Sequence, residues 1–75
     1  MDGERDEEKR ILDDIRMLDE NLPKVTGKDE KSARIADLAK RYRDDAEYYL
    51  KKKDYVTAFG CINYAHGLLD ALVKW

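Results

Sequence analysis

Residues 55–74 read YVTAFGCINYAHGLLDALVK, and this stretch decides the fold. Between Tyr55 and Val73 the one formally charged residue is Asp70. At about 100° per residue, most of the apolar side chains fall on one broad face of a helix. That face comprises Tyr55, Ala58, Phe59, Ile62, Ala65, His66, Leu69, Leu72 and Val73, and it is extended by Cys61 and Leu68. Because a helix that is apolar nearly all round is usually buried nearly all round, we expect this third helix to be the most buried element.

The chain before residue 55 is dominated by charge. Of the 32 charged residues, 29 precede Asp54. Apolar residues nevertheless recur at helical spacing in two places, which predicts helices at about 4–21 and 29–52. The first stripe is Ile11, Ile15, Leu18 and Leu22; the second is Ile35, Leu38, Ala39, Tyr42, Ala46, Tyr49 and Leu50.

The connections between the helices are short. Pro23 and Gly27 predict a loop over residues 22–28, with Val25 tucked back against the core. Asp54 is expected to cap the third helix, because its carboxylate can accept hydrogen bonds from free backbone N–H groups. Short links place successive helices side by side and antiparallel. The sequence therefore predicts one domain, residues 1–75, that folds as an all-α, three-helix antiparallel bundle.

Length and composition exclude several classes of protein. With 75 residues and one cysteine, the chain has no internal disulfide to stabilise its small core. No apolar run approaches the roughly 18–20 residues that span a membrane, and no signal peptide is evident. The net charge is −2 with both signs interspersed, so a nucleic-acid partner is not expected. We expect a soluble, cytoplasmic protein.

A second, weakly apolar face of the third helix is the main candidate site. Gly60 and Gly67 lie seven residues apart, on the same side as Tyr64 and Ala71. Each glycine inside a helix costs roughly 0.8–1.0 kcal/mol relative to alanine, so two on one face need a compensating reason. That reason is close approach by another helix, either the first helix of the same chain or the third helix of a second copy. The second case predicts a homodimer.

No catalytic, cofactor-binding or metal-binding residues are predicted. His66 is the only histidine, and Asp70 follows it at i+4, where it could orient the ring or share a cation. A lone histidine at the edge of an apolar face is more often structural. Cys61 points to a different side of the helix from His66 and is expected to act as a small hydrophobic residue.

Two tyrosines are candidates for contact with a different partner. Tyr48 points toward the charged face of the second helix, and Tyr55 lies at the start of the third. Exposed tyrosines anchor partners at many interfaces. Together they would mark one end of the bundle as a docking site for a peptide or protein.

Residues 45–71 carry a recognisable combination of motifs: Tyr48-Tyr49, then Asp-Tyr-Val-Thr-Ala-Phe at 54–59, then Tyr-Ala-His-Gly-Leu-Leu-Asp-Ala at 64–71. This combination resembles an archaeal family of small helical proteins classed as a domain of unknown function. Relatives often carry glycine just before the Asp-Tyr pair, where this chain has Lys53. The resemblance implies a helical bundle and an archaeal, cytoplasmic origin, and it implies no activity.

These observations together predict a non-enzymatic interaction or scaffold domain that self-associates through its third helix. An adaptor that binds a peptide or protein through Tyr48 and Tyr55 is the main alternative. Association with nucleic acid is a less favoured third.

Overall fold

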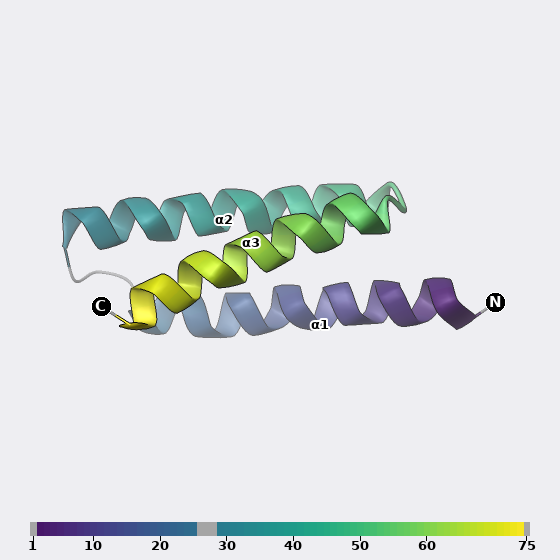
Figure 1. Ribbon diagram of the computed structural model, residues 1–75, viewed down its shortest axis with the longest axis horizontal. Helices are drawn as coiled ribbons and strands as arrows, with labels where there is room; N and C mark the ends of the chain where they lie inside the picture. Colours follow the sequence, from purple (N-terminus) through teal and green to yellow (C-terminus); the bar gives the residue numbers. More distant parts are fainter. Residues whose placement is uncertain (1, 26–28, 75) are drawn as a thin grey trace.

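The structure is a computed structural model that describes residues 2–25 and 29–74. The described residues form three helices. They are α1 (Asp2–Val25), α2 (Glu30–Lys51) and α3 (Tyr55–Lys74). Figure 1 shows α1 and α2 running in opposite directions, with α3 returning beside both of them, parallel to α1. The molecule is a rod of 45 × 15 × 14 Å. The predicted three-helix bundle is confirmed.

The C-terminal end of α1 differs from the prediction. The expected loop over 22–28 is wrong for its first four residues, because α1 continues through Pro23 to Val25. A proline inside a helix removes one backbone hydrogen bond and crowds the preceding turn. Continuing the helix keeps Leu22, 5% exposed, on the core side and packs Val25 against the core. Gly27 and Lys28 lie outside the described residues.

α2 begins and ends within one residue of the predicted bounds. Asp29 is its N-cap: the side chain accepts a hydrogen bond from the Ser32 backbone N–H at 2.7 Å. The core face of α2 is built from small residues, with Ser32, Ala36, Ala39 and Ala46 buried beside Leu50. Small side chains let the neighbouring helix approach closely, and the contact between α2 and α3 is the most extensive in the bundle.

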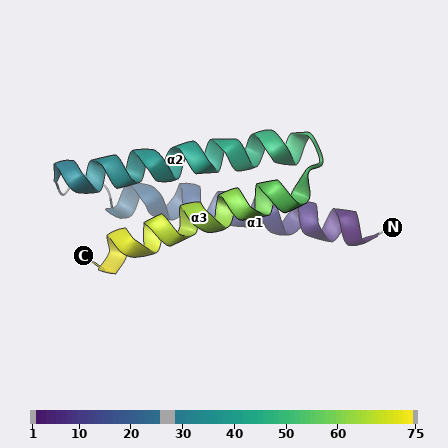
Figure 2. The ribbon, with the colours of Figure 1, turned by 45° about the horizontal axis from the view of Figure 1, so that its top comes forward.

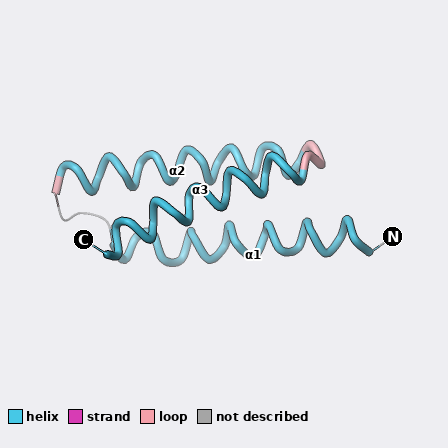
Figure 3. The backbone as a smooth tube through the Cα atoms, in the orientation of Figure 1, coloured by secondary structure: helices cyan, strands magenta, loops and turns pink. Residues whose placement is uncertain are grey.

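The turn between α2 and α3 closes with a lysine in the left-handed conformation. Lys53 has φ 63°. Its N–H donates to the Leu50 carbonyl, and the Asp54 N–H donates to the Tyr49 carbonyl, both at 2.9 Å. This pair of bonds is the Schellman pattern, in which glycine usually occupies the left-handed position. Figure 3 shows this turn, and the short segment just before α2, as the described loop segments.

Asp54 caps α3 as expected. Its carboxylate accepts from the Thr57 N–H at 3.3 Å, and its carbonyl accepts from the Ala58 N–H at 3.0 Å. The turn and the cap together set the direction in which α3 returns.

A single core joins the three helices. The predicted stripe on α1 is buried throughout, with each side chain at most 5% exposed. α3 contributes five residues to the same core: Ala58, Ile62, Ala65, Leu69 and Leu72. Because α3 lies against both α1 and α2, as the view in Figure 2 also shows, it is the element that the other two share.

α3 takes part in the most extensive helix contact of the bundle, yet it is not covered on all sides within the chain. Val56 is 85% exposed and Val73 is 61% exposed. Phe59, placed by the sequence pattern on the core side, is 44% exposed. Two neighbouring helices cover only one side of a third, and the remainder of this apolar helix faces outward.

Candidate interaction surface

The side of α3 that faces away from the core forms a continuous weakly apolar surface. We call it the outer face of α3 and define it by Val56, Gly60, Tyr64, Gly67 and Ala71. Val56 and Tyr64 are 85% and 52% exposed. Both glycines are exposed and Ala71 is half-buried. The helical spacing of these five residues puts them on one side of α3, as the sequence pattern predicted.

The two glycines are not approached closely within the chain. A Cβ atom built on Gly60 or Gly67 would meet no atom of the described residues within 4 Å, apart from the local backbone of α3 itself. The alternative in which α1 of the same chain packs against these glycines is therefore wrong. α1 lies along another flank of α3, where its side chains fill the space between the helices.

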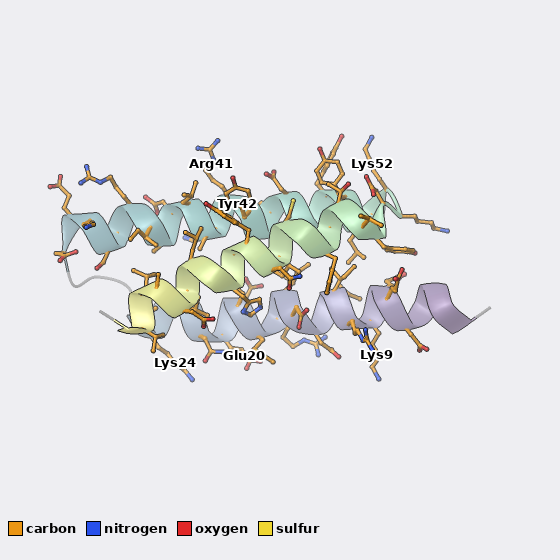
Figure 4. The ribbon with its side chains drawn as sticks, in the orientation of Figure 1. Lys9, Glu20, Lys24, Arg41, Tyr42 and Lys52 are labelled. Atoms are coloured by element: carbon orange, nitrogen blue, oxygen red, sulfur yellow. The ribbon has the colours of Figure 1, made fainter. Side chains whose placement is uncertain are left out.

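Tyr64 connects the outer face to α2. Its ring centroid lies 4.5 Å from that of Tyr42, with the ring planes tilted by 56°. Tilted aromatic pairs at this separation are favourable beyond the area they bury. In Figure 4 the labelled Tyr42 side chain extends from α2 toward α3. The contact holds the Tyr64 ring in place while leaving half of it accessible.

The opposite flank of α3 carries a groove. Its apolar lining comes from Ile11 on α1 and from Tyr55, Val56 and Phe59 on α3. Glu7 and Arg10 of α1 also line it, and its volume is about 170 Å³. The groove is continuous with the outer face through Val56, which belongs to both.

Several charged side chains of α1 and α2 project from the two edges of the bundle. Figure 4 shows Arg41 and Lys52 projecting from the α2 edge of the bundle, and Lys9, Glu20 and Lys24 from the α1 edge. The outer face itself has no charged residue. The outer face of α3 is thus uncharged, whereas Glu7 and Arg10 line the neighbouring groove and Asp70 is exposed elsewhere on α3.

The two tyrosines predicted to bind a partner face different neighbours. Tyr48 is 53% exposed; its ring lies edge-on to Tyr49 at 5.1 Å, and the Lys52 Nζ is 5.0 Å from its centroid. Tyr55 packs against the core and lines the groove between α1 and α3. Both lie at the same end of the bundle, Tyr48 near the end of α2 and Tyr55 at the start of α3.

His66 links α3 to α1. Its Nε2 lies 2.8 Å from the Asp14 carbonyl oxygen, so the ring donates its Nε2–H to that carbonyl. Within the described residues no three His, Cys, Asp or Glu side chains are grouped as a metal site requires. A structural role for His66 accounts for its position, and Asp70 is exposed beside it.

Cys61 is half-buried and free. Partial burial raises the pKa of its thiol above the ordinary cysteine value, and the negative charges of Asp45 and Asp54 raise it further. A raised pKa favours the protonated thiol over the nucleophilic thiolate.

Sequence reasoning missed the ion pair that joins α1 to α2. The Arg43 guanidinium donates from Nε and Nη2 to the two carboxylate oxygens of Asp19, each at 2.9 Å. Its Nη1 donates to Glu47, one turn further along α2, at 3.0 Å. Hydrogen bonds with Asp19 are the largest cause that raises the pKa of Arg43. No local pattern in the sequence connects residues 19 and 43, so this pairing required the fold.

One sequence expectation about membranes also needs correction. Residues 55–73 have a mean hydropathy of 1.2 over a length sufficient to cross a bilayer, so an apolar run of that length is present. The core helix of a water-soluble protein can have the same length and hydropathy. In α3, five buried residues belong to the core shared with α1 and α2, which accounts for the apolar character of its inner side.

Comparison with known proteins identifies the family of the chain but assigns it no activity. No curated protein matches the chain. The family described as "Protein of unknown function (DUF357)" matches residues 13–75, from the middle of α1 through α3. The match covers well over half of the sequence, so the chain belongs to this family of unknown function.

Proposed function

We propose that the protein is a non-enzymatic interaction or scaffold domain that self-associates through the outer face of α3. The observation that carries this proposal is the open space beside Gly60 and Gly67. Each glycine destabilises the helix by roughly 0.8–1.0 kcal/mol relative to alanine, and no contact of the described chain compensates for it. A helix from outside the chain would supply the missing contact.

The chemistry of the surface favours a second copy over a charged partner. The outer face contributes no charge, whereas α1 and α2 carry most of the charge of the chain. A surface of this kind is matched by another uncharged helix face, and the same strip on a second copy provides one. In a two-fold dimer the same patch contributes from both subunits.

The size of the face indicates a weak dimer. Twenty residues of helix extend about 30 Å, and one helix face is about 10 Å wide. Such a strip is smaller than a standard interface of about 800 Å² per partner. The expected dissociation constant is therefore in the micromolar range, and the dimer would exchange with monomers.

A helical adaptor that binds a peptide or protein through Tyr48 and Tyr55 is the second candidate. The 53% exposure of Tyr48 favours it. Nucleic-acid association is the third, and salt-dependent retention on a nucleic-acid column would reveal it. We also propose that the protein is cytoplasmic and archaeal. The charged composition supports the first part, and the resemblance carried by the motifs at 48–49, 54–59 and 64–71 supports both.

Light scattering across the micromolar range tests self-association. The wild-type protein is expected to approach the mass of a dimer as its concentration rises. Gly67→Leu is expected to remain a folded monomer, because the added side chain has room within the chain but blocks a second helix. Ala33→Leu, which enlarges an exposed position on α2, serves as the matched control and should dimerise like the wild type.

Two results would contradict the proposal. One is a wild-type protein that stays monomeric at high micromolar concentration. The other is a Gly67→Leu variant that remains folded by circular dichroism and still dimerises with unchanged affinity.

A further inference from the structure

We draw no further inference here: the strongest candidate, the groove between α1 and α3 that Ile11, Tyr55, Val56 and Phe59 line beside the outer face of α3, is an unpartnered apolar surface, and nothing in the structure shows what covers it.

Discussion

The inner and outer faces of α3 belong to one helix but differ in how far their side chains are exposed. On the inner face Ala58, Ile62 and Ala65 are fully buried. On the outer face Val56 is 85% exposed, and the two glycines stand in open space. The difference shows that an apolar sequence does not by itself bury a helix. How much of its surface is buried depends on how many neighbouring helices pack against it. Here two neighbours cover one side.

Truncation on each face should give the largest contrast. Ile62→Ala removes a fully buried side chain and is expected to lower the free energy of unfolding by about 2–5 kcal/mol. Val56→Ala should change it by less than about 0.5 kcal/mol at a concentration at which light scattering gives the mass of a monomer. Urea titration followed by circular dichroism measures both. Comparable losses from the two variants would mean that α3 does not have one buried and one open side.

The boundary between the two faces on the α1 side is marked by His66. His66→Phe keeps a ring of similar shape but removes the hydrogen bond to the Asp14 carbonyl. We expect the free energy of unfolding to fall by about 1 kcal/mol, because a net hydrogen bond contributes about that much. Asp70→Asn is the control and should have no effect on the dilute monomer. If instead Asp70→Asn matches the loss from His66→Phe, the ring is oriented by Asp70.

Alanine at the glycines should act in the opposite direction. In dilute solution Gly60→Ala and Gly67→Ala are each expected to raise the free energy of unfolding by roughly 0.8–1.0 kcal/mol, since a methyl group has room and alanine favours a helix. Urea titration at low micromolar concentration measures this gain. A loss of stability would show that another part of the chain occupies the space beside the outer face.

The smallest effect is expected at the turn that directs α3 back along the bundle. Lys53 adopts φ 63°, a conformation that glycine accepts without a Cβ clash. Lys53→Gly should therefore raise the free energy of unfolding by about 0.5–1 kcal/mol. Lys52→Gly is the matched control, because Lys52 has an ordinary φ of −84° and should lose about as much. If both variants raised the free energy of unfolding, or both lowered it, the left-handed conformation of Lys53 would not explain the result.

Periodicity predicted what depends on local spacing. The α1 stripe, the bounds of α3 and the cap at Asp54 each follow from residues a few positions apart, and the structure shows them. The continuation of α1 through Pro23 was not predictable in this way, since the burial of Leu22 and Val25 outweighs the local penalty of proline only once the core exists. The pairing of Asp19 with Arg43 likewise depends on how two helices are placed.

For the candidate surface, the sequence identified the residues but left their surroundings open. Gly60 and Gly67 were on one side of the helix by spacing alone. Whether α1 filled that side required the angle at which α1 packs on α3, which the contact of His66 with Asp14 reflects. Once α1 is placed there, the glycines face outward, and self-association becomes the proposal that accounts for them.

The most direct measurement of that proposal is a dilution series of amide NMR spectra recorded on the uniformly labelled wild-type protein. The amides of Gly60 and Gly67, together with those of Asn63 and Tyr64, should shift progressively between high and low micromolar concentration. The amides around Leu12 and Asp19 on α1 should stay fixed. Spectra that do not change with concentration, or shifts confined to α1 and α2, would contradict self-association through the outer face of α3.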